Sequence, residues 1–401
     1  MKLNKSKYLL CALLGAAVFL SGCAAQEKTA DTTVAESGSS SITENAEVLS
    51  AKTYTGGDAP VKLIGRTHTE NEILWLAHSA SGIEFTFKGN SASVTLAGDG
   101  AAFSNKDSQA RFAVYINGER TMDEQIDSAE KTYDIYSAEE ASEVTVKLLK
   151  LSESANSTFG IKSIDVNSVN EISPTAEKNM KIEFIGDSIT CGYGVDDEVK
   201  EHHFSTSTED ATRAYAFKTA ELLDADYSLV SYSGHGIISG YSGDGKKQTS
   251  QLVPKLYEQF ARSYGSSSGY FSISDDWDFS RFVPDFVVIN LGTNDESYTK
   301  KDKEKIADYQ TSYVEFIKMV RRNNPEAYII CALGIMGDGL YPAVENAVSD
   351  YIAETGDNNV SAFHLTPQNG STGFAADWHP TEATHEIAAK ELSEYIKTID
   401  K

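Results

Sequence analysis

Two residues in the second half of the chain have the types that acyl-transfer chemistry needs. Ser188 follows the apolar segment from Lys181 to Gly186, and a serine hydroxyl becomes a nucleophile when a neighbouring base takes its proton. Among the eight histidines, His379 best suits that base, since it lies in a loop, close to Asp377, and before a proline that restricts its backbone. Alone, the Gly-Asp-Ser triplet around Ser188 is weak evidence, because turns and helix caps also favour it.

Two further residues could stabilise the oxyanion that such an attack creates. Asn294 follows the apolar run from Phe286 to Leu291, and its side-chain amide could donate a hydrogen bond to the oxyanion. Gly234 follows the run from Tyr227 to Tyr232 and could offer a backbone N–H, with Gly236 as a near competitor. Both have ordinary readings as well, a helix cap for the asparagine and a flexible turn for the glycine.

The segments that must position these residues are of two kinds, which differ in the spacing of their apolar residues. From residue 175 onward, apolar runs of buried-strand length alternate with amphipathic helical segments. This pattern predicts an α/β fold, a flavodoxin-like parallel sheet covered by helices on both faces. Ligands bind such sheets at the carboxyl ends of the strands, where all four residues fall. The expected strands are 181–186, 227–232, 286–291, 328–333 and 360–365, and the expected helices are 213–223, 306–322, 343–354 and 381–399.

In the preceding segment, residues 56–170, apolar residues recur at every second position instead. Short alternating runs without a helical stretch predict a β-sandwich (jelly-roll) domain, and Asn117-Gly118 predicts a type I′ turn within it. This domain is either a packing partner for the second domain, residues 175–401, or a sugar-binding module. The stretch from Ile237 to Pro284 is long and rich in Gly, Ser and Tyr, so it is a candidate substrate-facing insertion.

The N-terminus has the pattern of an export signal. Residues 1–23 combine early lysines with a short apolar run and end in Leu20-Ser21-Gly22-Cys23, which resembles the bacterial lipoprotein signal. The resemblance implies lipidation of Cys23 and a place on the extracellular face of the cell membrane; the alternative is an ordinary signal and a secreted protein. Residues 24–55 are rich in Ser, Thr, Ala and Glu and should form a disordered tether.

Composition restricts the partners. A formal net charge of −24 disfavours nucleic acid and anionic membrane surfaces, whereas a neutral polysaccharide carries no such penalty. Beyond the leader only Cys191 and Cys331 remain, and we expect both to be buried free thiols. No CxxC or HExxH motif is present, so neither a metal nor a cofactor is expected.

The joint order of Ser188, Gly234, Asn294 and His379 resembles the SGNH, or GDSL-type, hydrolase superfamily. A closer resemblance is to carbohydrate esterase family 2, which places a small jelly-roll domain before the hydrolase domain. That resemblance also rests on Gly65-Arg66 and on Ser233-Gly234-His235-Gly236. It implies an acetylxylan esterase-like enzyme that removes O-acetyl groups from plant cell-wall polysaccharides such as xylan and glucomannan. The backbone N–H groups of Ser188 and Gly234 and the Asn294 amide would form the oxyanion hole.

The acid partner of the base is left open by the sequence. Asp377 precedes His379 by two positions, while the superfamily more often has three, and Ala376 occupies the usual place. Either Asp377 completes the triad or a backbone carbonyl orients the histidine. Trp378, between acid and base, is expected to stack on a sugar ring, with Tyr241 and Trp277 as weaker candidates.

Two other functions compete with the acetyl esterase. A lipase or thioesterase of the same superfamily would want an apolar acyl channel, but the loops here are polar and rich in Gly and Ser. A noncatalytic surface carbohydrate-binding lipoprotein would keep its function after replacement of Ser188.

Overall fold

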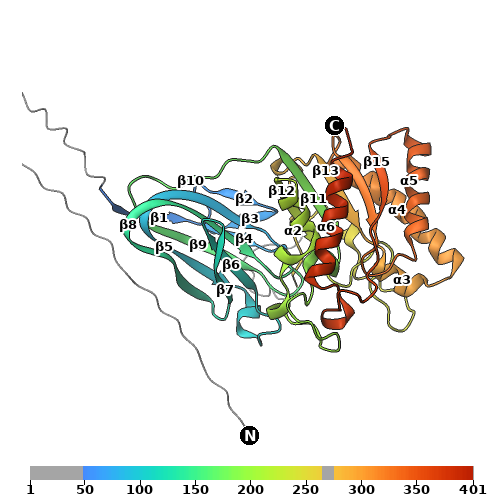
Figure 1. Cartoon of the computed structure of the whole chain (residues 1–401), viewed down its shortest axis with the longest axis horizontal. Coiled ribbons are helices and arrows are strands. Elements are labelled where there is room, and N and C mark those ends of the chain that lie inside the picture. Colours follow the sequence, from blue (N-terminus) through green and yellow to red (C-terminus); the bar gives the residue numbers. More distant parts are fainter. Residues whose placement is uncertain (1–47, 264–274, 401) are drawn as a thin grey trace, which may run out of the picture. The chain divides into compact units, whose positions relative to one another are not determined.

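The computed structural model describes residues 48–263 and 275–400 (Figure 1). The expected signal, the lipidation site Cys23 and most of the expected tether lie outside the described residues. The tether boundary at residue 55 is wrong, because β1 (Ser50–Thr55) pairs antiparallel with β9 along its whole length. Strand pairing uses backbone hydrogen bonds, which any residue can form. The side chains of β1 are mostly polar, so the sequence shows no alternation of apolar residues that would predict this strand. Among the described residues no helix is long and apolar enough to cross a membrane.

The first domain is a single antiparallel sheet that curls around one core, which confirms the predicted β-rich fold (Figure 1). Two long strands, β5 and β8, pair with each other, and their pairing contains register shifts at which the strands bend. These two strands run through both layers of the sandwich, so the two layers belong to one sheet. The main path through the sheet is β3-β4-β9-β5-β8-β6-β7. The strands are β1, β2 (Lys62–Ile64), β3 (Thr67–Glu70), β4 (Ile73–Leu76), β5 (Gly82–Gly98), β6 (Arg111–Ile116), β7 (Glu119–Gln125), β8 (Glu130–Lys150), β9 (Phe159–Ser168) and β10 (Ser173–Pro174).

Alternation of apolar side chains builds this core. Ile83, Phe85 and Phe87 of β5 all point inward and are fully buried, as a period of two requires. Asn117 and Gly118 join β6 to β7 with φ of 53° and 88°, the positive values that a type I′ turn needs.

The second domain is a five-stranded parallel sheet in the order β12-β11-β13-β14-β15. One buried apolar cluster lies against each face, and helices α2 and α6 pack together on one side while α4 and α5 pack together on the other. The sequence predicted these strands and helices; the short helices α1 and α3 were not predicted. The bounds are β11 (Met180–Gly186), α1 (Ser188–Cys191), α2 (Tyr215–Leu222), β12 (Ala225–Ser231), β13 (Phe286–Asn290), α3 (Thr293–Thr299), α4 (Lys303–Asn323), β14 (Tyr328–Leu333), α5 (Tyr341–Thr355), β15 (Val360–His364) and α6 (Glu382–Ile396).

The sheet order brings the candidate residues to one edge. Ser188, Gly234 and Asn294 come two to four residues after β11, β12 and β13, and these three strands are neighbours with the carboxyl end of β11 in register with both others. His379 lies in the connection from β15 to α6. Cys191 and Cys331 are buried and free, as expected.

The two domains share a buried polar interface. Arg66, fully buried, donates to the carbonyl oxygens of Tyr257 and Gln259 at 2.6 and 2.8 Å and pairs with Glu183 of β11 at 3.3 Å. The Arg66 guanidinium also lies over the rings of Tyr257 and Trp277. Three residues of the stretch 237–284, which the sequence suggested faces substrate, therefore contact the first domain instead: Tyr257, Gln259 and Trp277.

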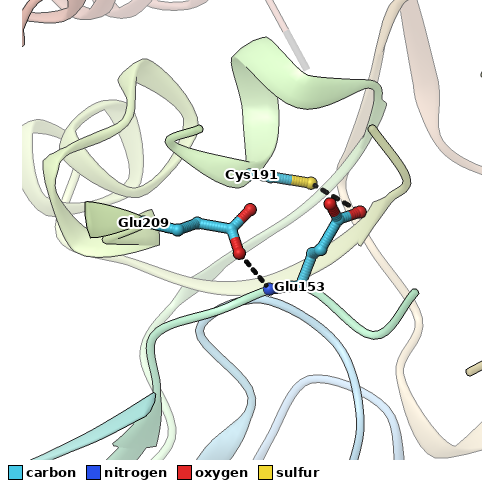
Figure 2. A group of neighbouring side chains, drawn as sticks. All are labelled: Glu153, Cys191 and Glu209. Atoms are coloured by element: carbon cyan, nitrogen blue, oxygen red, sulfur yellow. Dashed lines mark hydrogen bonds between the residues drawn. The ribbon is translucent and has the colours of Figure 1, made fainter. Parts of the chain in front are cut away.

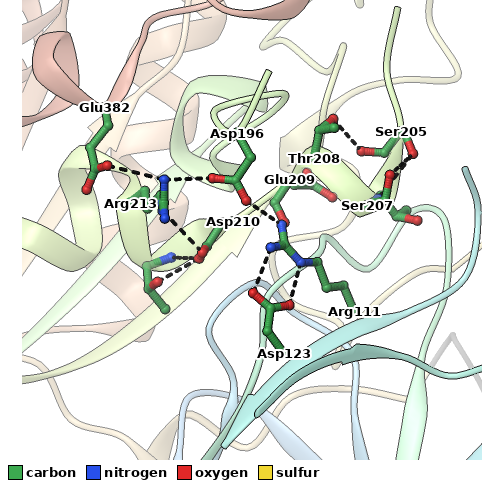
Figure 3. Close-up of polar contacts among 12 residues, drawn as sticks. Arg111, Asp123, Asp196, Ser205, Ser207, Thr208, Glu209, Asp210, Arg213 and Glu382 are labelled. Carbon is green, nitrogen blue, oxygen red and sulfur yellow. Dashed lines mark hydrogen bonds and ion pairs between the residues drawn. The ribbon is translucent and has the colours of Figure 1, made fainter. Parts of the chain in front are cut away.

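A second set of ion pairs joins the domains at another point (Figure 3). Arg111 of β6 donates to Asp196 at 2.7 Å and to the Glu209 carbonyl oxygen at 3.2 Å. Asp196 also pairs with Arg213, which in turn lies 3.4 Å from Glu382 at the start of α6. The charges of the two domains are thus partly neutralised against each other.

Candidate active site

The nucleophile candidate is positioned by the end of β11. Gly186 is required there, because a Cβ at that position would lie 2.0 Å from the Thr190 hydroxyl oxygen. Asp187 then caps α1 by accepting a hydrogen bond from the Ile189 N–H at 3.0 Å, so that Ser188 is the first helical residue. Since the first N–H groups of a helix have no partner within it, the Ser188 N–H is available to a ligand.

The structure brings Ser188 and His379 together. The Ser188 Oγ lies 2.9 Å from the His379 Nε2, and both side chains are almost wholly buried. The other ring nitrogen, Nδ1, lies 3.2 Å from the carbonyl oxygen of Ala376. If Nδ1 carries the proton and donates it to that carbonyl, Nε2 presents a lone pair to the serine hydroxyl, which is the arrangement of a general base.

Burial keeps the imidazole neutral. Desolvation lowers the pKa of His379 to about 4, although the Ala376 carbonyl and the charge of Asp377 both act to raise it. Tyr193 stacks on the ring with centroids 3.9 Å apart and planes 20° apart, which holds the imidazole in place. Sequence reasoning missed Tyr193; its position five residues after the candidate nucleophile is the only signal it offers.

Asp377 does not form the hydrogen bond expected of a triad acid. Its Oδ2 accepts from the Tyr193 hydroxyl at 2.6 Å and from the Phe204 N–H at 3.1 Å, while Oδ1 lies 2.8 Å from His203 Nδ1. Of the two alternatives for orienting His379, this structure has the arrangement of the second, since the acceptor that faces Nδ1 is the Ala376 carbonyl and the Asp377 carboxylate bonds other groups.

The local backbone explains this. Asp377 and Trp378 both have positive φ, 48° and 65°, so the chain turns tightly between Ala376 and His379. Burial would raise the pKa of Asp377, but the hydrogen bonds from Tyr193 and His203 lower it below its ordinary value. Asp377 is thus an ionised neighbour of the base and an anchor for the stacked tyrosine.

Asn294 is buried in the first turn of α3, which follows β13. Its Nδ2 donates to the His235 carbonyl oxygen at 2.9 Å and to Asp187 Oδ2 at 3.1 Å. Desolvation raises the pKa of Asp187 to about 7. Asp187 therefore links the cap of the nucleophile helix to the amide of Asn294.

Asp295 hydrogen-bonds the loop after β12, which carries Gly234 and Gly236. Gly234 has a φ of 75°, and its carbonyl accepts from the Tyr241 N–H at 2.8 Å. The buried carboxylate of Asp295 accepts three successive backbone N–H groups, those of residues 237, 238 and 239, at 2.7 to 3.1 Å. Gly236 approaches so closely that a Cβ there would lie 2.5 Å from Asp295 Oδ2. Asp295 was also missed by sequence reasoning, although it directly follows Asn294.

Two of the three aromatic candidates remain accessible. The exposed fraction is 50% for Trp378 and 63% for Tyr241. Trp277 is 6% exposed, packs in a cluster with Trp75 and Phe260, and lies under the Arg66 guanidinium of the first domain, so its expected contact with substrate is wrong. The Lys200 ammonium lies 4.1 Å from the centroid of a Trp378 ring.

One group of described residues has the spacing of a metal site. Ligand atoms of Glu153, Cys191 and Glu209 lie within 4.8 Å of one another (Figure 2). Backbone N–H groups already occupy one oxygen of each carboxylate, and the ammonium of Lys150 lies buried among their neighbours. Burial also raises the pKa of both Glu153 and Glu209, which disfavours the charged form that a metal ligand needs.

The sequence matches two family descriptions, one in each domain. Residues 184–387 match the GDSL-like Lipase/Acylhydrolase family, and residues 63–175 match Carbohydrate esterase 2 N-terminal. The chain is 33% identical over 326 residues to Cellulase/esterase CelE of Acetivibrio thermocellus, a match that covers 80% of this chain and 37% of that protein. The chain thus spans little more than a third of that relative.

Two other proteins match over most of their length. Acetylxylan esterase / glucomannan deacetylase of Cellvibrio japonicus is 25% identical, with 90% of this chain and 95% of that protein covered. A solved structure of a family two carbohydrate esterase from Clostridium thermocellum in complex with cellohexaose is 31% identical. It superimposes with a TM-score of 0.72 over 84% of this chain and 98% of that one. The chain therefore belongs to the GDSL-like lipase/acylhydrolase family and, with both domains matched, to the family 2 carbohydrate esterases.

Proposed function

We propose that this protein removes O-acetyl groups from plant cell-wall polysaccharides or their oligosaccharides, such as xylan and glucomannan. The observation that carries the proposal is the 2.9 Å contact between Ser188 Oγ and His379 Nε2 at the carboxyl end of the sheet. The relatives named esterase and acetylxylan esterase / glucomannan deacetylase support it, as does the relative solved with a bound cello-oligosaccharide.

The first half-reaction transfers the acetyl group to the enzyme. His379 Nε2 takes the hydroxyl proton as Ser188 Oγ bonds to the acetyl carbonyl carbon, whose oxygen becomes an oxyanion. The C–O bond to the sugar then breaks, and the imidazolium returns its proton to the leaving sugar oxygen. Water repeats the same steps on the acetyl-serine and releases acetate.

Three donors would stabilise the oxyanion. They are the backbone N–H groups of Ser188 and Gly234 and the Nδ2 of Asn294. Without substrate both hydrogens of Asn294 Nδ2 have acceptors, and the bond to Asp187 is the longer of the two. We expect that bond to be exchanged for the oxyanion, while the bond to the His235 carbonyl keeps the amide in place.

The imidazolium formed in each half-reaction also needs support. The Ala376 carbonyl accepts a bond from Nδ1–H, and the ionised Asp377 lies nearby. The stacked ring of Tyr193 is held by Asp377 through its hydroxyl. We propose that a dyad of Ser188 and His379, with the Ala376 carbonyl as the orienting group, carries out the reaction.

The accessible Trp378 and Tyr241 support a sugar substrate, because exposed aromatic rings stack on pyranose faces. Trp378 directly precedes the base, so a sugar on its ring would lie close to the reacting bond. The negative charge of the protein also favours a neutral polymer. We propose in addition that a lipid on Cys23 holds the enzyme at the cell surface; replacing Cys23 by serine should then move it from the membrane fraction to the medium.

Acetate release from acetylated xylan and acetylated glucomannan tests the function. The intact enzyme should release acetate, and Ser188→Ala should abolish it without loss of folded protein. Ser349→Ala, on the exposed side of α5, serves as the matched serine control and should be fully active. Release that persists in Ser188→Ala would refute the proposal. A protein that binds xylan but releases no acetate would be the noncatalytic alternative, and one active only on long-chain esters would be a lipase.

A further inference from the structure

A carboxylate of the first domain reaches the oxyanion loop of the second. Glu153 lies in the connection between β8 and β9 and is 1% exposed. Its Oε2 accepts the backbone N–H of Ser233 at 2.7 Å. Ser233 directly precedes Gly234, so this bond fixes the peptide next to the one that would donate to the oxyanion.

The same carboxylate touches the nucleophile helix. The Cys191 Sγ lies 3.8 Å from Glu153 Oε2, and Cys191 ends the single turn that Ser188 begins (Figure 2). Glu153 therefore contacts both segments that supply backbone donors, the one with Ser188 and the one with Gly234. Glu153 itself belongs to neither of these segments, since it lies in the connection between β8 and β9.

Glu153 is itself rigidly held. Its N–H donates to Glu209 Oε2 at 2.9 Å, and its carbonyl accepts from Lys150 Nζ at 2.8 Å. Asn156 donates to its other carboxylate oxygen at 3.2 Å. Lys150 is fully buried and also bonds the Ser152 carbonyl, so the loop between β8 and β9 is closed around its ammonium.

We propose that Glu153 is a positioning residue through which the first domain sets the geometry of the oxyanion hole. The proposal rests on the function proposed above for Ser188 and Gly234. It gives the first domain a part in the reaction that neither packing nor sugar binding would supply.

Energetics favour this role over simple packing. Burying a carboxylate is costly unless it is paired and hydrogen-bonded, and an apolar contact of similar volume would hold two domains together equally well. What a carboxyl oxygen adds is a short bond of fixed direction, here to the Ser233 N–H at 2.7 Å. A displacement of about 1 Å at a reacting centre can cost about 10²-fold in rate, so a modest shift of the Gly234 N–H would be felt in turnover.

Three substitutions at position 153 separate the possible roles. Glu153→Ala removes the acceptor, Glu153→Asp keeps the charge but retracts it by one methylene, and Glu153→Gln keeps the length and an acceptor oxygen. The matched control is Asp99→Ala: Asp99 is also a buried carboxylate of the first domain, and it holds the far end of the same loop through the Thr158 N–H at 2.9 Å.

The measurements are Tm, kcat and KM for acetate release, the rate of phosphonylation of Ser188 by a small aryl phosphonate, and Kd for a deacetylated xylo-oligosaccharide. Glu153→Ala and Glu153→Asp should lower kcat about 10- to 100-fold and slow phosphonylation by a similar factor. KM and the oligosaccharide Kd should stay within about twofold, since neither depends on the oxyanion donors. Glu153→Gln should retain more kcat than Glu153→Asp, and Asp99→Ala should lose Tm but keep kcat.

The opposite results overturn the proposal. A folded Glu153→Ala within about threefold of the native kcat would do so. So would an Asp99→Ala variant whose kcat falls as far for the same loss of Tm, or a Glu153→Gln variant less active than Glu153→Asp. If the alanine variant does not fold, the aspartate variant decides by the same thresholds. Persistent activity in Ser188→Ala would instead refute the proposed function, whatever the Glu153 variants do.

Discussion

Replacing Asp377 by asparagine distinguishes the two ways of orienting His379. In a serine–histidine–aspartate triad, loss of the acid lowers kcat about 10⁴-fold, which corresponds to about 5.4 kcal/mol of transition-state stabilisation. In this structure the Asp377 carboxylate bonds Tyr193, Phe204 and His203 instead, and the Ala376 carbonyl faces Nδ1 of the base. The substitution should therefore remove a nearby charge but no bond to the imidazole.

The expected loss follows from where the charge lies. Asp377 has a side chain that is 32% exposed, and charge interactions at such positions contribute about 0.2–1 kcal/mol. That range corresponds to a fall in kcat of about 1.4- to 5-fold. Asparagine keeps an oxygen that can accept the Tyr193 hydroxyl, so the stacked ring should stay in place. Asp377→Ala, which frees the tyrosine as well, should lose more than Asp377→Asn.

Steady-state kcat for acetate release at pH 7 measures this directly, with His379→Ala as the inactive baseline. Asp357→Asn is the matched control, because Asp357 also accepts a tyrosine hydroxyl, that of Tyr351 at 2.7 Å, but lies at the amino end of β15, away from the site. A folded Asp377→Asn variant that loses 10³-fold or more would refute the reasoning, since only a direct bond to the base could account for such a loss.

Four further outcomes are expected. The pH profile of kcat/KM should rise with pH through a midpoint of about 4 and stay flat to pH 7, because His379 is an active base only when neutral; a midpoint between 6 and 7 would contradict this. Asn294→Ala should lower kcat about 10²- to 10³-fold in steady-state assays, whereas a loss below threefold would exclude it from the oxyanion hole. Gly236→Ala should reduce both kcat and Tm, since the new Cβ would lie 2.2 Å from the carbonyl oxygen three residues on; a fully active, equally stable variant would show that the loop can relax. Trp378→Ala should raise KM on acetylated xylan without changing Tm, while Trp277→Ala should lower Tm in a thermal melt, and the reverse pattern would exchange their roles.

The fold was predictable because the buried faces of strands and helices require apolar residues at regular spacings in the sequence. Before about residue 175 apolar residues recur at every second position, and after it strand-like runs alternate with helical segments; this change predicted both domains. It also placed Ser188, Gly234 and Asn294 beyond three strands that prove to be neighbours. Short helices such as α1 were not predicted, since a single turn is too short to show a regular spacing of apolar residues.

The details of the site depend on information that no local pattern contains. Whether Asp377 faces the base is decided by two positive φ angles in a turn of three residues. Trp277 looked accessible because its loop is polar, but Arg66, more than two hundred positions earlier, lies over its ring in a buried cluster. Glu153 meets Ser233 across eighty positions and a domain boundary, and nothing near either residue indicates the contact.

The buried pair of Arg66 and Glu183 bears on how such proteins can be recombined. Cutting the chain near residue 175 would leave Glu183 of β11 with the Tyr257 hydroxyl but without its cation, and removing one partner of a buried pair typically costs about 3–5 kcal/mol. A hydrolase half grafted onto a foreign module would carry that defect with it. Chimaeras between relatives are thus better built by exchanging the whole pair of domains than by swapping either half.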